Sequence, residues 1–97
     1  MPKESDYQSK LNARLESIFP GCIITKNDSR YIQGIPDWTI FYGNKYAMYE
    51  TKKSVDEPHR PNQDYYVDLV NDMAFAMFVY PENEEEFILR IYEYFAK

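Results

Sequence analysis

Apolar positions along the first half of the chain predict one helix followed by three strands. Four apolar side chains recur at helical intervals: Tyr7, Leu11, Leu15 and Ile18. They predict a helix over residues 5–18, which Pro20-Gly21 ends. Shorter β-branched and aromatic runs then predict strands over 22–26, 38–42 and 46–52. Because Gly43-Asn44 supplies the positive φ angles of a tight hairpin, we expect the last two strands to pair.

The second half predicts a helix, a strand and a final helix. Pro61 suits the first turn of a helix that runs to about Met73, and residues 75–80 form an apolar strand. Pro81 begins the last helix, whose acidic first turn complements the helix dipole. The expected buried face of this helix consists of Phe87, Ile88, Ile91, Tyr92 and Phe95.

The element order αβββαβα predicts an α/β fold. The first three strands can form an antiparallel meander, after which a helix crosses over to the fourth strand. The result is a mixed central sheet of about four strands, flanked by helices.

Length and composition predict one domain. The chain has 97 residues, 44% of them apolar, which are enough for one core, so we expect a single domain over residues 1–97. Cys22 has no second cysteine to pair with, which favours a reducing cytoplasm. No stretch approaches the ~20 apolar residues that span a bilayer. We therefore expect a cytoplasmic protein without a membrane segment.

The distribution of charge matters more than the net charge of −5. Residues 61–97 hold eight acidic and two basic side chains, so this third of the chain would repel a polyanion. Residues 26–60 hold six basic and five acidic side chains, and this is the expected region of phosphate contact.

The predicted hairpin brings three chemically active side chains together. Glu50 and Lys52 lie two positions apart, so they share one face of an extended strand. If Gly43-Asn44 is a two-residue turn, Asp37 lies directly opposite Glu50. Two carboxylates so placed can share a hard divalent cation such as Mg²⁺ or Mn²⁺. The alternative is a weak surface pair on an exposed strand, beside an ordinary strand-entry aspartate.

Polar side chains also continue the apolar stripes of two predicted helices. Glu4 and Gln8 extend the stripe of Leu11 and Leu15, and Gln63 precedes Val67 in the same manner. Such helix ends aim a carboxylate or an amide at the sheet where a polar site interrupts the core. Frayed, solvated helix ends are the alternative.

Three segments in order resemble the PD-(D/E)xK nuclease superfamily: Gly34-Ile35-Pro36-Asp37, Met48-Tyr49-Glu50-Thr51-Lys52 and Arg60-Pro61-Asn62-Gln63. In that superfamily Pro-Asp precedes Glu-x-Lys by one hairpin. The third segment is similar to the VRR-NUC branch and its phage-type, stand-alone members related to Holliday junction resolvases, in which Gln63 would be the helical glutamine. The resemblance runs from Glu4 to about Tyr80 and implies a restriction-endonuclease-like core.

The resemblance implies metal-dependent hydrolysis of DNA phosphodiester bonds, with branched DNA as one expected substrate. Asp37, Glu50, the carbonyl of Thr51 and Glu4 would hold one or two Mg²⁺ (or Mn²⁺) ions. Lys52 would stabilise charge on the phosphate, and Gln63 would position water or Lys52. The expected contacts to the DNA backbone are Lys26, Arg30, Lys45 and Arg60.

Four-way junctions need two symmetric cuts, so we expect a homodimer. Two other classes remain open: an inactive nuclease-like protein that binds DNA or a protein partner, and a purely structural module. Lys53, on the opposite strand face, is expected to be structural or solvated, and His59 is expected to be exposed.

Overall fold

The expected order of elements is confirmed in the computed structural model, which describes residues 4–97, and their side chains from residue 5. The elements are α1 (Glu4–Ile18), β1 (Ile23–Lys26), β2 (Trp38–Tyr42), β3 (Lys45–Thr51), α2 (Gln63–Met73), β4 (Ala76–Val79), η1 (Pro81–Asn83) and α3 (Glu84–Ala96). No helix in the described part combines the length and apolar character needed to cross a membrane.

The strands form one mixed sheet in the order β1-β2-β3-β4. β1, β2 and β3 are an antiparallel meander, whereas β4 runs parallel to β3, which requires the crossover through α2. The predicted α/β class and mixed sheet are therefore confirmed.

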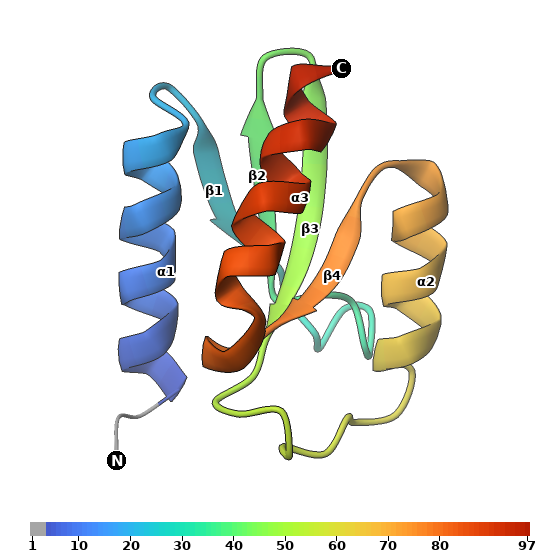
Figure 1. Cartoon of the computed structure of the whole chain (residues 1–97). Coiled ribbons are helices and arrows are strands. Elements are labelled where there is room, and N and C mark those ends of the chain that lie inside the picture. The colour runs from blue at the N-terminus through green and yellow to red at the C-terminus, as the bar shows by residue number, and fades with distance from the viewer. Residues whose placement is uncertain (1–3) are drawn as a thin grey trace.

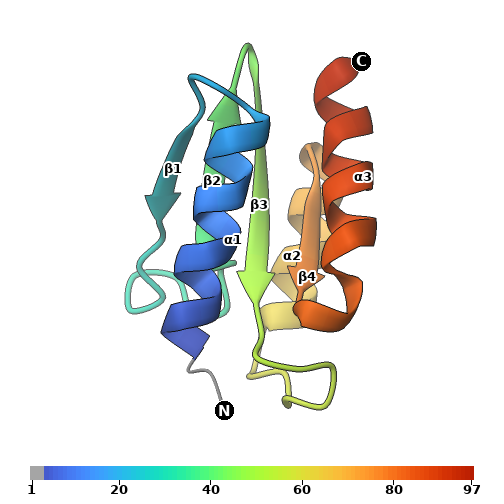
Figure 2. The ribbon, with the colours of Figure 1, turned by 60° about the vertical axis from the view of Figure 1, so that its left-hand side comes forward.

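Helices cover both faces of this sheet. α1 and α3 lie on one face, and α2 packs over β3 and β4 on the other (Figures 1 and 2). The side chains of β3 alternate accordingly. Ala47 and Tyr49 enter the core beneath α1 and α3, while Tyr46 and Met48 pack against Val67 and its neighbours on α2. By the same alternation, Glu50 and Lys52 belong to the α2 face and Thr51 to the α1 face.

Two helix starts differ from the sequence-based expectation. α2 begins at Gln63 and not at Pro61, because Asn62 adopts a left-handed φ of 70° that breaks the helical path. After β4, Pro81 begins the 3₁₀ turn η1, and α3 follows from Glu84. Asn83 stabilises this turn, since its side chain accepts from the Tyr80 main-chain N–H at 2.9 Å and donates to the Phe78 carbonyl at 3.0 Å.

The expected buried face of the last helix is partly wrong. Phe87 and Ile91 are buried, and Ile88 and Phe95 are half-buried, but Tyr92 is 56% exposed. Tyr92 lies at the edge of the apolar stripe, where its ring touches the rim of the core at Phe19, with 6.0 Å between ring centroids.

Candidate active site

The hairpin register places Asp37 beside Glu50. Gly43-Asn44 forms the turn, Tyr42 pairs with Lys45, and the ladder continues to Trp38 opposite Tyr49. One position further, the main-chain N–H of Asp37 donates to Oε1 of Glu50 at 3.2 Å. The juxtaposition predicted from the turn is therefore present.

Glu50 is a buried carboxyl group in an unfavourable electrostatic position. It is only 4% exposed. Burial is the largest cause of a pKa of about 8 for Glu50, and the charge of Asp37 and a side-chain hydrogen bond with Asp37 raise it further. The charge of Lys52 and the Asp37 N–H act in the opposite direction. The two carboxyl groups thus share one small volume, in which a divalent cation would relieve their repulsion.

A relay of hydrogen bonds from α1 holds the Asp37 side chain. Nε2 of Gln8 donates to the hydroxyl of Thr51 at 2.8 Å, and this hydroxyl donates to Oδ2 of Asp37 at 3.2 Å. The expectation that the polar end of the first helix is directed at the sheet is confirmed for Gln8. Glu4 begins the helix, but its side chain lies outside the described residues, so its role as a metal ligand stays a prediction.

Lys52 has an ammonium group that is buried and held by the loop leading to α2. The residue is 2% exposed. Its Nζ donates to Oε1 of Gln63 at 2.8 Å and to the carbonyl of Pro58 at 3.2 Å, and it lies 3.6 Å from Oε2 of Glu57. The same Gln63 oxygen accepts from the main-chain N–H of Arg60 at 2.7 Å. Gln63 therefore fixes both Lys52 and the start of α2.

Sequence reasoning missed Glu57. Besides facing Lys52, its carboxylate accepts from the main-chain N–H of Lys53 at 2.8 Å, so it folds the loop back onto the end of β3. Nothing in the periodicity of residues 54–60 indicates this contact, because a loop path depends on its own hydrogen bonds.

A close contact between two loops gives Gly34 its role. Gly34 has a φ of +93°, and a Cβ atom built there would lie 2.6 Å from the carbonyl carbon and the Cβ of Asn62. Only glycine fits. The loop that carries Asp37 is thereby fixed against the turn that begins α2. At its base, the Asn27 side chain donates to the Pro36 carbonyl at 2.8 Å, which fixes the approach to Asp37.

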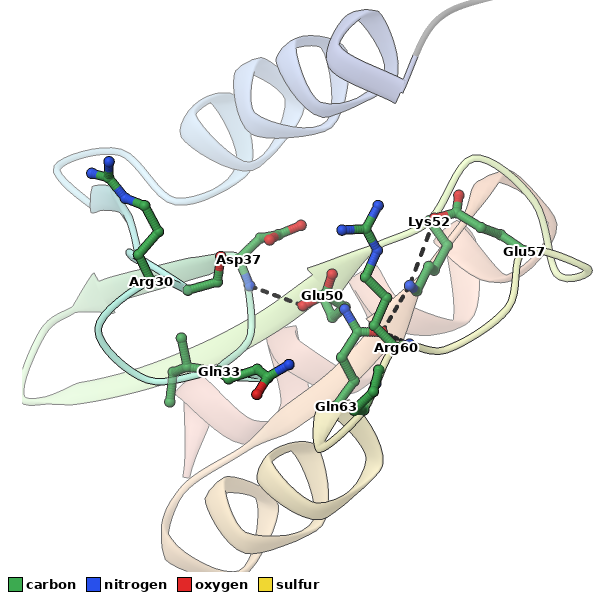
Figure 3. A pocket seen from close by; sticks show the side chains of 12 residues that line it. Arg30, Gln33, Asp37, Glu50, Lys52, Glu57, Arg60 and Gln63 are labelled. Atoms are coloured by element: carbon green, nitrogen blue, oxygen red, sulfur yellow. Dashed lines mark hydrogen bonds and ion pairs between the residues drawn. The ribbon is translucent and has the colours of Figure 1, made fainter.

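These side chains surround a pocket of about 530 Å³ at the end of the sheet where Asp37 lies (Figure 3). Its lining residues are Ser29, Arg30, Gln33, Gly34, Ile35, Asp37, Glu50, Lys52, Glu57, Arg60, Pro61 and Gln63. The predicted catalytic residues therefore share one pocket with two of the four expected DNA contacts, Arg30 and Arg60.

The other two expected DNA contacts lie outside the pocket. Lys26 is placed over the Trp38 ring, with Nζ 4.6 Å from the ring centroid. Lys45 is at the hairpin end of the sheet, where its Nζ donates to the carbonyls of Tyr94 and Lys97 at the end of α3. Lys45 satisfies a helix C-terminus and does not face the pocket.

Two further expectations concern residues near the pocket. Lys53 is exposed, as expected. His59 is exposed too, as expected, and it also makes two contacts: its ring stacks on Phe78 with centroids 3.9 Å apart, and its Nδ1 lies 2.7 Å from Oδ1 of Asp64. The stack on β4 holds the loop before α2 against the sheet.

The donor set fits a small hard cation with few protein ligands. Among the described side chains, no group of three or more His, Cys, Asp or Glu residues is arranged to hold a metal ion. Asp37 and Glu50 bring two carboxyl groups together. This number suits Mg²⁺, which binds through one or two carboxylates together with water and substrate phosphate.

Comparisons of the chain with protein-family models, with curated proteins and with solved structures find no match. The geometry of this pocket and the motifs that line it are therefore the features from which a function can be inferred.

Proposed function

We propose that this chain is a metal-dependent endonuclease that hydrolyses DNA phosphodiester bonds in the pocket of Asp37, Glu50 and Lys52. The observation that carries the proposal is the buried pairing of two carboxyl groups beside a buried lysine. Such a cluster is costly for the fold, since buried charges are desolvated and like charges repel. A cost of this kind is typical of functional sites. The segments that build the cluster are those that resemble the PD-(D/E)xK superfamily and its VRR-NUC branch.

Asp37 and Glu50 would hold the cation, and the carbonyl of Thr51 and the carboxylate of Glu4 are the further ligands that the resemblance implies. When bound, Mg²⁺ or Mn²⁺ supplies Lewis acidity toward the scissile phosphate and lowers the pKa of a coordinated water. Asp37 is preoriented for ligation, because the hydroxyl of Thr51 already fixes one of its oxygens at 3.2 Å.

Lys52 would stabilise the negative charge that develops on the phosphate. Its ammonium is placed before substrate arrives, because Gln63 and the Pro58 carbonyl hold it. A group positioned in advance needs little reorganisation during the reaction, which makes its charge more effective. Gln63 acts in this account as the positioning residue for Lys52.

The acidity of the C-terminal third is compatible with DNA binding at this pocket. Two of its acidic residues, Glu84 and Glu85, form ion pairs with Arg14 of α1 at 2.6 Å and 2.5 Å. α1 and α3 lie on the face of the sheet opposite α2 (Figure 1), so the acidic residues of α3 lie apart from α2, whereas Asp64, Asp68 and Asp72 belong to α2 itself. The pocket itself carries Arg30 and Arg60 beside the carboxylates, and these two arginines are the proposed contacts to backbone phosphates.

A second candidate is a nuclease-like protein that binds DNA without cutting it. The observation in its favour is that no group of three or more His, Cys, Asp or Glu residues among the described side chains is arranged to hold a metal ion. We favour cleavage, because a protein that only binds DNA has no need of a buried carboxylate pair, which repels phosphate.

The active form is proposed to be a homodimer on branched DNA, since one pocket cuts one strand. Light scattering at micromolar concentration, with and without a four-way junction, tests this. A monomer that cuts both strands of a junction would contradict it.

Cleavage by purified protein tests the proposed function. Labelled duplex, flap and four-way junction DNAs are incubated with wild-type protein in Mg²⁺ and in EDTA. We expect cleavage in Mg²⁺ alone, and its loss in both Asp37→Asn and Glu50→Gln. Lys53→Ala is the matched control, because it removes a neighbouring lysine that is exposed. Tight DNA binding by a wild-type protein that never cuts would favour the second candidate.

A further inference from the structure

Tyr31 is the most exposed of the large apolar side chains in the described part of the chain, at 88%. It lies between Arg30 and Gln33, both of which line the pocket. Two residues of chain span at most ~7 Å, so the backbone of Tyr31 lies close to the pocket, although its ring is not part of the lining. An aromatic ring that is this exposed contributes little to the core, and its faces are available for contact with a ligand.

Hydrogen bonds order the backbone of the loop that carries this ring. The main-chain N–H of Tyr31 donates to the Asp28 carbonyl at 3.1 Å, and that of Ile35 donates to the Ile32 carbonyl at 3.2 Å. Asp28 also accepts from the guanidinium of Arg30 through both carboxylate oxygens, each at 3.1 Å. The contact of Gly34 with Asn62 anchors the loop to α2. Because the loop is already ordered, a ligand that stacks on Tyr31 incurs little ordering cost.

The reactive groups lie at the floor of a recess. Glu50 is 4% exposed and Lys52 is 2% exposed, while the loop of Arg30 and the loop of Arg60 form the walls. A phosphate must enter this recess to reach them. Double-stranded DNA is stiff over ~150 base pairs and cannot follow a sharp local bend without deformation. An unpaired strand bends freely, and its bases are available for stacking.

Arg60 provides a charge for the entering strand. Its side chain extends into the pocket (Figure 3), and its guanidinium has no hydrogen bond or ion pair to any described residue. A planar guanidinium left unpaired suits bidentate contact with a phosphate.

From these observations we propose that the loop of residues 28–35 binds an unpaired nucleotide next to the scissile phosphate, with its base stacked on Tyr31 and its phosphate on Arg60. This inference rests on the proposed function and deepens it: the substrate class is DNA with a single-stranded segment at the cleavage position. Stacking on an aromatic side chain tolerates any base, so the site selects for strand state and not for sequence.

Equilibrium binding in EDTA tests the inference without any cleavage. Fluorescence anisotropy compares a labelled single-stranded oligonucleotide, the same sequence as a blunt duplex, and a duplex with a single-stranded flap. Tyr31→Ala should weaken binding of the single strand and the flap by about tenfold, in line with the usual effect of removing one stacking partner, and should change duplex binding by less than twofold. Tyr31→Phe, which keeps the ring, should restore wild-type affinity.

Tyr92→Ala is the matched control, since it removes an exposed tyrosine of α3, on the face of the sheet opposite α2, and it should leave all three affinities unchanged. The inference is overturned if wild-type protein shows no preference for unpaired DNA. It is also overturned if Tyr31→Ala weakens the binding of duplex and single strand equally, or weakens the binding of neither. Loss of single-strand affinity in Tyr31→Phe as large as that in Tyr31→Ala would overturn it as well. Tyr31-dependent binding by a protein that never cuts would refute the proposed function and leave only the binding of an unpaired nucleotide by the loop of residues 28–35 standing. Cleavage by a protein whose DNA binding does not depend on Tyr31 would support the proposed function and refute this inference.

Discussion

The main-chain N–H of Asp37 donates to the carboxylate of Glu50 at 3.2 Å, across the end of a hairpin whose turn lies at Gly43-Asn44. This contact joins the two halves of the motif, which lie 13 residues apart in the chain. It also brings the side chain of Asp37 close enough to raise the pKa of Glu50. The register that pairs the two strands of the hairpin therefore also creates the repulsion between the Asp37 and Glu50 carboxylates, which a cation would relieve.

Stability of the metal-free protein should fall as the pH rises. The pKa of Glu50 is about 8 in the folded protein, above its ordinary value of 4.5. Between these values the folded state holds a proton that the unfolded state has released, so the free energy of unfolding decreases with pH and levels off above pH 8. Urea denaturation in EDTA should show a loss of roughly 3–4 kcal/mol between pH 5 and pH 8.

Glu50→Gln provides the control for this pH dependence, because the amide does not titrate. The variant should be more stable than wild type at pH 8 and close to it at pH 5. A Glu50→Gln protein with the same pH dependence as wild type would show that another group titrates.

Lys52→Ala should lower kcat by about 10²–10³-fold, the usual effect of losing one preplaced electrostatic group, with little change in Mg²⁺ dependence. Lys53→Ala should stay within about twofold of wild type, since Lys53 is exposed in the loop that follows β3 and does not line the pocket. Steady-state cleavage kinetics measure both. Equal losses from the two substitutions would mean that Lys52 has no special role.

Glu57→Gln tests the contact that holds Lys52 in the resting protein. The amide oxygen can still accept from the Lys53 N–H, but the charge 3.6 Å from Nζ of Lys52 is removed. We expect a loss of about 1 kcal/mol in the free energy of unfolding, and a larger loss for Glu57→Ala, which also removes the acceptor. Denaturation in urea measures both variants, and a Glu57→Ala protein as stable as wild type would contradict the contact.

Gly34→Ala should destabilise the fold by about 2 kcal/mol or more, because the new methyl group would lie 2.6 Å from atoms of Asn62 at a φ of +93°. Gly43→Ala is the matched control. Gly43 also has a positive φ, of +63°, but nothing lies within 4 Å of its added Cβ, so only the backbone preference of about 1 kcal/mol is lost. If the two variants have equal urea midpoints, the loops are not in contact.

The parts of the site that follow a regular period could be predicted from sequence. The turn at Gly43-Asn44 and the two-residue alternation of a strand together placed Asp37, Glu50 and Lys52 on one site. Helical spacing likewise indicated that Gln8 and Gln63 face the sheet, and both do so through hydrogen bonds at 2.8 Å to Thr51 and Lys52.

The parts that depend on loop paths could not be predicted in this way. Glu57 reaches Lys52 because the loop after β3 folds back on itself, and that path has no periodic signal. The start of α2 was misplaced for a similar reason. Pro61 is favourable at a first helical turn, but the contact between Gly34 and Asn62 fixes a left-handed residue at that point. At the start of α2, the contact between the two loops therefore outweighs the preference of Pro61 for a first helical turn.

The most direct test of the account is Mg²⁺-dependent cleavage by purified wild-type protein and Asp37→Asn, run side by side on the same flap and four-way junction DNAs. Asp37→Asn preserves the size of the side chain and the main-chain N–H that contacts Glu50, so the fold should persist while cation binding is lost. The account predicts cleavage by wild type in Mg²⁺, none in EDTA, and at least a hundredfold loss in the variant. Cleavage by Asp37→Asn at the wild-type rate would contradict it.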